Sequence, residues 1–290
     1  MSVENVLKQF NVGRSSLLAI TQFKSAEDGS LYNAWKIELE SGAYVLKKAK
    51  GDEILIYSTF FSKKTAGAPQ FVASASYEGE GYFLMEYVEG QDLCLCDRQR
   101  LVAVLDALIS IQSRYWQSVE HASIGVSFEK GLKKAQGRME YLKDEQIERA
   151  YLLFLKQYSA LPRTLCHEDL LPFNVLASNE SATLIDWEYA GILPYPLSLA
   201  RFIAHAEECD GAFFYMRDED KSFAIDYYYN NFIKHKGIAY ADYIFAMDCF
   251  LLYEYCEWIM LGNKYEDADM ERYHVYLQKA KVHLNALAVY

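Results

Sequence analysis

Short apolar runs separated by polar or glycine-containing turns fill the first ninety residues of the chain. Their alternating pattern and their β-branched and aromatic content are typical of antiparallel strands. Four strands are expected, at residues 16–23, 34–40, 43–48 and 81–87. The turn formed by Glu40, Ser41 and Gly42 predicts a hairpin between the second and third strands, and residues 52–63 predict a helix. The pattern therefore predicts a small β-rich lobe with one helix.

The pattern changes after Asp97 to apolar residues at helical spacing. In the first such segment they are Leu101, Val104, Leu105, Leu108, Ile111 and Tyr115, which predict an amphipathic helix. Residues 225–235 and 242–261 follow the same period, whereas residues 164–189 form an island of apolar strands and polar loops. The chain shows no repeat or linker, so we expect an α+β protein of one domain. Its two lobes would be residues 1–88 and 89–290.

The island at residues 164–189 carries the candidate chemistry. Asp169 stands five residues before Asn174, and Asp186 follows a short apolar strand, an arrangement that phosphoryl transfer requires. Asp169 could accept the proton of an attacking hydroxyl, while Asn174 and Asp186 offer hard oxygen ligands for Mg²⁺. Any one of these residues alone would be typical of a turn. Together with His167 they stand in the order of a catalytic motif, which favours function.

The same residues resemble the aminoglycoside phosphotransferase and choline kinase family, small-molecule relatives of the protein kinases. The family pattern is His-x-Asp, four residues, Asn, and then Ile-Asp-Trp/Phe-Glu, and residues 184–191 are especially similar to the choline kinase branch. The resemblance extends from about residue 15 to residue 205. It implies a protein-kinase-like two-lobed fold, with a small antiparallel β lobe and a larger, mainly α lobe. It also implies ATP and Mg²⁺ as cofactors.

The resemblance implies further nucleotide-binding residues in the small lobe. Residues 44–47 are similar to the kinase strand whose lysine binds the α- and β-phosphates. Lys47 is favoured over Lys48, because neighbours on a strand point to opposite faces and only one can enter the cleft. Glu53 begins the helix that in this family supplies the carboxylate partner of that lysine. We therefore expect Lys47 and Glu53 to form an ion pair.

Two other segments are expected to contact the nucleotide. Residues Met85, Glu86 and Val88 resemble the kinase hinge, where backbone groups of Glu86 and Val88 would bind adenine and Met85 would shape the pocket wall. The loop after the first strand has no Gly-x-Gly-x-x-Gly motif. Ser25 and Ser30 could nevertheless donate to phosphates from a turn.

Two departures from the family pattern leave alternatives open. The family has Asp-Leu-Ala after the metal-binding strand, its Asp bracing the catalytic loop, whereas this chain has Ser198, an uncharged and weaker brace. Glu168 stands where the family has Gly or Asn. Ser198 also leaves open the alternative of a non-catalytic binding protein that keeps the fold. A protein kinase is disfavoured, because no Ala-Pro-Glu segment or long activation loop follows Asp186.

Charge bears on the partner. The net charge of -11 argues against nucleic acid and acidic membranes, which are bound by an excess of Lys and Arg. On a C-terminal helix, Glu254, Glu257 and Trp258 combine carboxylates with an aromatic face, which suits a cation. Such a helix is also typical of a half-buried surface. The expected function is an ATP-dependent small-molecule O-kinase whose acceptor is a hydroxyl-bearing cation, either aminoglycoside-like or an amino alcohol such as choline or ethanolamine.

The remaining features concern the cellular compartment. The six cysteines include no Cys-x-x-Cys pair, so neither a zinc site nor a disulfide framework is indicated. The first ten residues lack a signal-peptide core, and no run reaches the roughly 18 apolar residues of a membrane span. We therefore expect a cytoplasmic protein. The sequence leaves open its oligomeric state and its preference between ATP and GTP.

Overall fold

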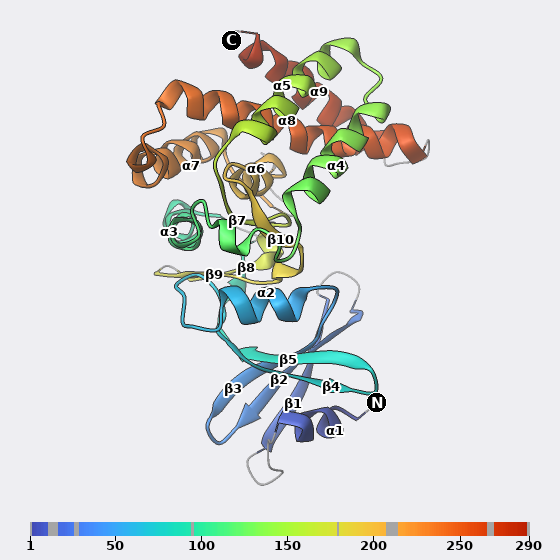
Figure 1. Cartoon of the computed structure of the whole chain (residues 1–290), viewed down its shortest axis with the longest axis vertical. Coiled ribbons are helices and arrows are strands. Elements are labelled where there is room, and N and C mark those ends of the chain that lie inside the picture. Colours follow the sequence, from blue (N-terminus) through green and yellow to red (C-terminus); the bar gives the residue numbers. More distant parts are fainter. Residues whose placement is uncertain are drawn as a thin grey trace.

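Two lobes are stacked along the long axis of the molecule (Figure 1). The computed structural model describes residues 2–10, 17–25, 29–93, 96–178, 180–206, 214–265 and 270–288. The smaller lobe is an antiparallel sheet and the larger lobe is mainly helical, with α2 lying between them (Figure 1). The predicted α+β class is thus confirmed, while the division after residue 88 stays a prediction.

The sheet of the smaller lobe has five strands in the described part of the chain, in the order β1-β2-β3-β5-β4. They are β1 Leu17–Lys24, β2 Leu31–Leu39, β3 Gly42–Lys48, β4 Phe71–Tyr77 and β5 Glu80–Glu86. Leu39 pairs with Gly42, which confirms the predicted hairpin. The strand β4 was not expected, although its exposure alternates along its length as a strand on a half-covered sheet requires.

Helices cover both faces of this sheet. The helix α2, Glu53–Phe60, lies on the face toward the larger lobe, and the short helix α1, Val3–Leu7, lies on the other (Figure 1). Leu46 of β3 packs in the same apolar cluster as α1, so the alternation of a strand turns Lys47 toward α2. The expectation of one helix in this lobe was wrong, because α1 is a second, and α2 ends at Phe60 rather than near residue 63. Phe61 leaves the helix to pack against Trp187.

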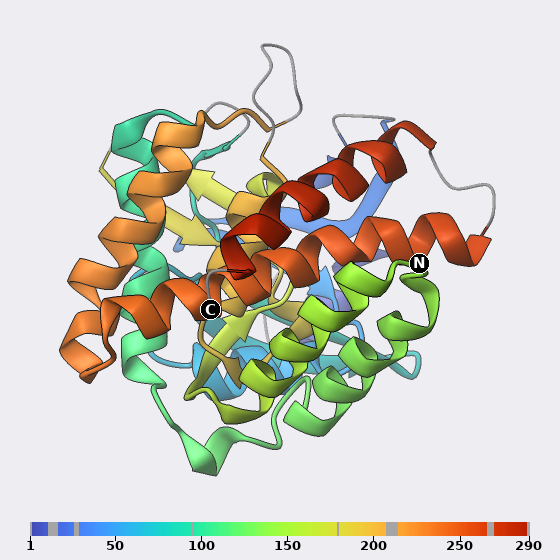
Figure 2. The same cartoon turned by 90° about the horizontal axis from the view of Figure 1, so that it is seen from above.

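The larger lobe is built around α8. Its helices are α3 Arg98–Arg114, α4 Phe128–Arg138, α5 Glu145–Ala160, α6 Leu197–Ala204, α7 Asp218–Asn231, α8 Tyr240–Tyr265 and α9 Met270–Leu287. Seen from above, α8 and α9 run side by side with α5 against α8 (Figure 2). Phe250 and Tyr253 of α8 pack against Phe154 of α5. The structure thus contains the expected helices at 225–235 and 242–261, except that α7 ends at Asn231 before a separate 3-10 turn. Within the described ranges no helix is both long and apolar enough to cross a bilayer.

Short strands at the base of the larger lobe hold the loops that carry the motif. They are β6 Gln91–Asp92, β7 Arg163–His167, β8 Val175–Ala177, β9 Ala182–Leu184 and β10 Ala190–Pro194. His167 at the end of β7 pairs with Ala190 of β10, and Val175 of β8 pairs with Leu184 of β9. Gly191 lets β10 approach the chain before α4, since a Cβ there would lie 2.1 Å from the carbonyl oxygen of Val126. These pairings place the loop that carries Asp169 and Asn174 after β7, and Asp186 shortly after β9.

Candidate active site

Three predicted residues meet where the lobes face each other. Lys47 Nζ lies 2.6 Å from Glu53 Oε1 and 2.7 Å from Asp186 Oδ1. Burial by itself would lower the pKa of Lys47, but the charges of Asp186 and Glu53 raise it above its ordinary value, so the lysine is cationic. Burial raises the pKa of Glu53, and the charge of Lys47 opposes that effect. Lys48, on the opposite face, pairs with Glu80 instead.

The candidate catalytic loop, residues 167–174, is held by hydrogen bonds around His167. The backbone N–H of Asp169 donates to His167 Nδ1 at 3.2 Å, so the ring proton is on Nε2 and donates to the carbonyl of Ile185 at 2.8 Å. Burial lowers the pKa of His167, which favours this neutral form. Asn174 Nδ2 donates to the carbonyl of Asp169 at 2.7 Å, and the N–H of Ile185 donates to the carbonyl of Asn174 at 2.9 Å. Asp169, Asn174 and the strand before Asp186 are therefore fixed relative to one another.

Two buried side chains, Ser198 and Trp187, contact His167 in this loop. Ser198, at the start of α6, accepts a hydrogen bond from the backbone N–H of His167 at 2.8 Å. The hydroxyl stands where the resemblance leads one to expect a carboxylate, and it gives a neutral brace rather than a charged one. The indole of Trp187 packs against the His167 ring at 4.7 Å, and its Nε1 donates to the carbonyl of Leu184. The serine thus keeps contact with the loop without adding charge.

Asp186 has a left-handed backbone, with φ 61° and ψ 59°. For a residue with a Cβ this conformation costs roughly 1–2 kcal/mol. It turns the chain at the end of β9 so that the carboxylate reaches Lys47. The oxygen atoms of Asp186 and Asn174 are the donor types that Mg²⁺ prefers, so the residues present fit this metal.

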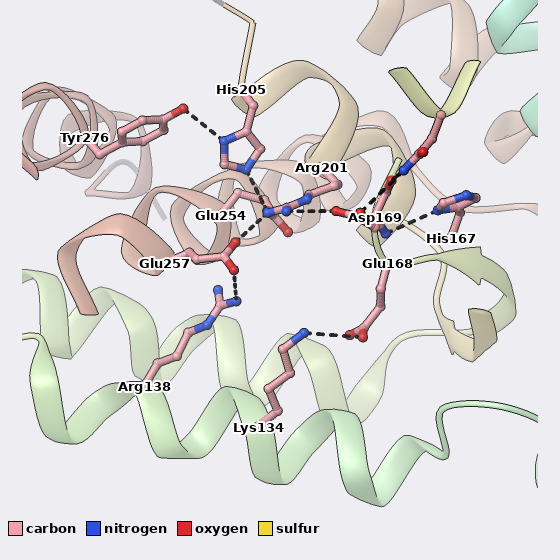
Figure 3. A network of polar contacts seen from close by, with 11 residues as sticks. Lys134, Arg138, His167, Glu168, Asp169, Arg201, His205, Glu254, Glu257 and Tyr276 are labelled. Atoms are coloured by element: carbon pink, nitrogen blue, oxygen red, sulfur yellow. Dashed lines mark hydrogen bonds and ion pairs between the residues drawn. The ribbon is translucent and has the colours of Figure 1, made fainter. Parts of the chain in front are cut away.

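A pocket of about 190 Å³ opens beside Asp169. It lies among α4, α6 and α8, and Figure 3 shows charged side chains from all three helices converging on it. The lining residues are Lys134, Arg138, Glu168, Asp169, Tyr189, Leu197, Arg201, Tyr253, Glu254 and Glu257. The position of the pocket next to the candidate base makes it the candidate acceptor site.

Arg201 of α6 is the centre of the ion pairs in this pocket (Figure 3). Its Nη2 lies 3.0 Å from Asp169 Oδ1, and its Nη1 lies 3.0 Å from Glu254 Oε2 and 2.5 Å from Glu257 Oε2. Burial by itself would raise the pKa of Glu254, but Arg201 and then His205 lower it to about 2. His205 also contacts the Tyr276 hydroxyl. The guanidinium therefore connects the catalytic loop to α8.

Two further cations come from α4. Arg138 donates to the carbonyl of Tyr253 at 2.8 Å, stacks over its ring and lies 3.5 Å from Glu257. One turn earlier, Lys134 lies 3.4 Å from Glu168. Glu168 thus forms an ion pair with another residue of the pocket lining. Each carboxylate that lines the pocket has a cationic partner.

The pocket includes two of the three expected acceptor residues. Glu254 and Glu257 line it, whereas Trp258 is not among its described lining residues and stacks on Tyr276 of α9 at 5.8 Å. Sequence reasoning missed the basic residues Lys134, Arg138 and Arg201. A signal for Arg201 existed, since a charged residue in the mostly apolar segment 197–204 is expected to be paired.

The other predicted nucleotide contacts lie in the smaller lobe. Met85 is buried in the sheet at the end of β5, and the N–H of Glu86 donates to the carbonyl of Gln70 at 2.9 Å. The Glu86 N–H is thus engaged within the lobe. The N–H of Ser25 donates to the carbonyl of Ser30 at 2.8 Å and closes the turn between β1 and β2. These roles stay predictions.

Comparison with known proteins decides the family. The profile of the phosphotransferase enzyme family matches residues 23–215, more than half of the chain. This chain belongs to the phosphotransferase enzyme family. The predicted family resemblance is thereby confirmed. Among curated proteins, no sequence matches this phosphotransferase significantly.

Solved structures share the fold of this phosphotransferase. An aminoglycoside phosphotransferase from Alicyclobacillus acidocaldarius has a TM-score of 0.65 at 14% identity, covering 99% of this chain and 96% of its own. A thermostable mutant of aminoglycoside phosphotransferase APH(4)-Ia, in a ternary complex with ADP and hygromycin B, has a TM-score of 0.61 at 14% identity over 98% of both chains. A choline kinase from Cryptosporidium parvum has a TM-score of 0.60 at 16% identity over 98% and 94%. At these identities the likeness shows the fold, and it confirms the kinase-like two-lobed architecture.

Proposed function

We propose that this phosphotransferase moves the γ-phosphate of ATP to a hydroxyl group of a small molecule. The observation that carries the proposal is the cluster of Lys47, Glu53 and Asp186 between the lobes, with Asp169 beside a pocket. Lys47 would bind the α- and β-phosphates, and Asn174 and Asp186 would hold Mg²⁺. The metal, when bound, neutralises phosphate charge. The solved neighbours with ADP or AMP-PNP support nucleotide binding in this fold.

Asp169 is the group positioned to receive the acceptor proton. A bond would form between the acceptor oxygen and the γ-phosphorus, the bond to the β,γ-bridging oxygen would break, and the hydroxyl proton would pass to the Asp169 carboxylate. Its side chain is about one-third exposed and faces the pocket, so a bound hydroxyl can reach it. Oδ1 is held by Arg201, and among the described residues Oδ2 has only a long 3.4 Å contact from Asn174. The geometry leaves Oδ2 for the hydroxyl.

The sequence favours a cationic acceptor, and the pocket lining contains both carboxylates and cations. The carboxylates of Glu254 and Glu257 do line the pocket, and solved neighbours include an aminoglycoside phosphotransferase with hygromycin B and a choline kinase. However, both carboxylates are already paired with Arg201, and Glu257 is also paired with Arg138. A cationic acceptor would have to share them.

Calorimetric titration with ATP, with and without Mg²⁺, tests the proposal. Asp186→Ala should abolish the effect of Mg²⁺ on affinity, weakening Mg-ATP binding by more than the about 10–100-fold typical for loss of an outer metal contact. The matched control is Asp226→Ala, at an exposed position of α7, and it should bind Mg-ATP as the wild type does. Equal affinity and equal metal dependence in Asp186→Ala would mean that this carboxylate only shapes a turn. Wild-type binding without any turnover of hydroxyl compounds would favour the non-catalytic alternative that Ser198 suggests.

A further inference from the structure

The charges of the acceptor pocket are balanced without a ligand. Apart from the candidate base Asp169, the lining has as many cations as carboxylates. They are Lys134, Arg138 and Arg201 against Glu168, Glu254 and Glu257. Each of these carboxylates lies within ion-pair distance of one of these cations. The formal charges of the lining residues therefore sum to the single negative charge of Asp169.

Arg201 occupies the place where a cation would bind. His205, Glu254 and Glu257 each offer a ligand atom, and these atoms lie within 4.8 Å of one another, close enough to surround one positive ion. Arg201 Nη1 is 3.0 Å from Glu254 Oε2, 2.5 Å from Glu257 Oε2 and 3.0 Å from His205 Nε2. The guanidinium group of the protein itself thus fills the cation position.

The other end of the same guanidinium reaches the reacting centre. Arg201 Nη2 donates to Asp169 Oδ1 at 3.0 Å. The arginine is only 16% exposed, and Glu254 is 3% exposed, so the contact between them is shielded from water and salt. A planar fork with fixed donors can hold two carboxylates at a set distance, which a lysine cannot. Arg201 therefore sets the position of Asp169 relative to α8.

We propose that Arg201 is the built-in cation of the acceptor pocket: it positions Asp169, and it excludes a substrate ammonium from Glu254 and Glu257. The acceptor is then a polyhydroxyl compound, such as a sugar or polyol, that carries no positive charge near the reacting hydroxyl. A substrate ammonium at this place would meet like charge from Arg201 and Arg138 at close range. This inference rests on the proposed phosphotransfer, and it replaces the cationic acceptor expected from the sequence.

Chemical rescue tests the positioning role. Hydrolysis of Mg-ATP, with water as the acceptor, is measured for the wild type and Arg201→Ala, each with guanidinium ion or with NaCl at equal ionic strength. We expect the kcat of Arg201→Ala to be about 100-fold lower than that of the wild type, as a misplacement near 1 Å can cause. Guanidinium should restore the kcat of this variant to at least a tenth of the wild-type value. Arg149→Ala, which removes an exposed arginine of α5, should keep wild-type kcat. Unchanged kcat in Arg201→Ala, or a loss that guanidinium does not repair, overturns the role.

A second measurement needs no turnover. Guanidinium, kept far below denaturing concentrations, should raise the Tm of Arg201→Ala relative to NaCl, because it refills the cation position, and should leave the wild-type Tm unchanged. If Arg201→Ala does not fold, the double variant Arg201→Met/Glu254→Gln removes the cation together with one carboxylate. That variant should fold and should keep wild-type affinity for Mg-ATP while its kcat falls. Equal Tm responses of wild type and variant, or an unchanged kcat in the double variant, count against the inference.

Matched acceptors test the exclusion of cations. A neutral sugar and its 2-amino analogue are compared by ADP release, and the ratio of kcat/KM for the amine to that for the neutral sugar is recorded. The wild type should prefer the neutral member, and Arg201→Met should raise the ratio at least tenfold because Glu254 and Glu257 lose the cation that they share, while Glu257 keeps its pair with Arg138. Wild-type preference for the amine, or a ratio unaffected by Arg201→Met, would refute the inference. Failure of wild type to bind Mg-ATP would instead remove the proposed function.

Discussion

Replacing Lys47 with methionine removes the cation that compensates a fully buried carboxylate. Glu53 has no exposed side-chain surface and lies 2.6 Å from Lys47 Nζ. Loss of one partner of a buried ion pair costs about 3–5 kcal/mol, because the other charge stays buried without compensation. At about 2.1 cal/mol/K of unfolding entropy per residue over this chain, that cost corresponds to a Tm lower by about 5–8 °C. Lys47→Met should therefore be destabilising as well as unable to bind phosphates.

A double variant separates these two effects. In Lys47→Met/Glu53→Gln the buried group is a neutral amide, so most of the lost stability should return while affinity for Mg-ATP stays low. The matched control is Lys48→Met on the other face of β3. Lys48 pairs with Glu80 at the surface, where the two side chains are 31% and 53% exposed. Such pairs contribute about 0–1 kcal/mol, so the control should nearly keep the wild-type Tm.

The pH dependence has a definite sign. Burial raises the pKa of Glu53 above its ordinary value of 4.5, so the unfolded chain loses this proton at lower pH than the folded chain does. Ionisation of Glu53 therefore reduces stability as pH rises above 4.5, and loss of Lys47 enlarges that penalty. The deficit of Lys47→Met should be small near pH 4.5 and larger at pH 8.

Urea denaturation followed by circular dichroism at both pH values measures the four proteins. A Lys47→Met deficit that is no larger than that of Lys48→Met would refute the reasoning. The same holds for a deficit that Glu53→Gln does not reduce, or one that grows as pH falls. Each of these results would mean that water compensates Glu53 in a site that the structure shows as closed.

Three further variants test the candidate catalytic loop and the elements around it. Asp169→Asn should keep Mg-ATP affinity in calorimetry and lower turnover by about 10²–10⁴, as expected for loss of one general base; joint loss of binding and turnover would indicate a structural role. Gly191→Ala should lower the free energy of unfolding by about 1–3 kcal/mol or more, because its Cβ would lie 2.1 Å from the Val126 carbonyl. Gly137→Ala in α4, where a Cβ meets nothing within 4 Å, should instead stabilise the protein by about 0.5–1 kcal/mol in the same denaturation assay.

The spacing of apolar residues along the chain predicts which side chains share one face of a strand or helix. Alternation along a strand was enough to predict that Lys47 rather than Lys48 points toward Glu53, because the side-chain period of a strand is fixed. The helix α1 was missed since five residues show too little periodicity to stand out. The strand β4 was missed although it alternates, because small residues between Phe71 and Tyr77 give a weak apolar signal.

The acceptor pocket depends on contacts that no local pattern contains. Arg201 lies 53 residues from Glu254 in the chain, and only the packing of α6 on α8 brings them together. Trp258 was misplaced because the sequence shows that a residue is on a helix but not which neighbour each face meets. It follows Glu257 by about 100° around the helix axis, and that rotation carries its ring to Tyr276 on α9. The balance of charges in the pocket therefore follows from the tertiary structure and not from the sequence pattern.

The left-handed backbone at Asp186 affects how this protein can be engineered. Glycine adopts that conformation without a steric penalty, so a substitution there would relieve strain while deleting the carboxylate that faces Lys47. A screen for heat resistance alone therefore does not test whether this position, proposed above to hold Mg²⁺, keeps its carboxylate. Selection for heat resistance in this protein should therefore measure Mg-ATP binding in the same round as the melting temperature. Without that measurement, variants that are stable but no longer bind nucleotide would pass.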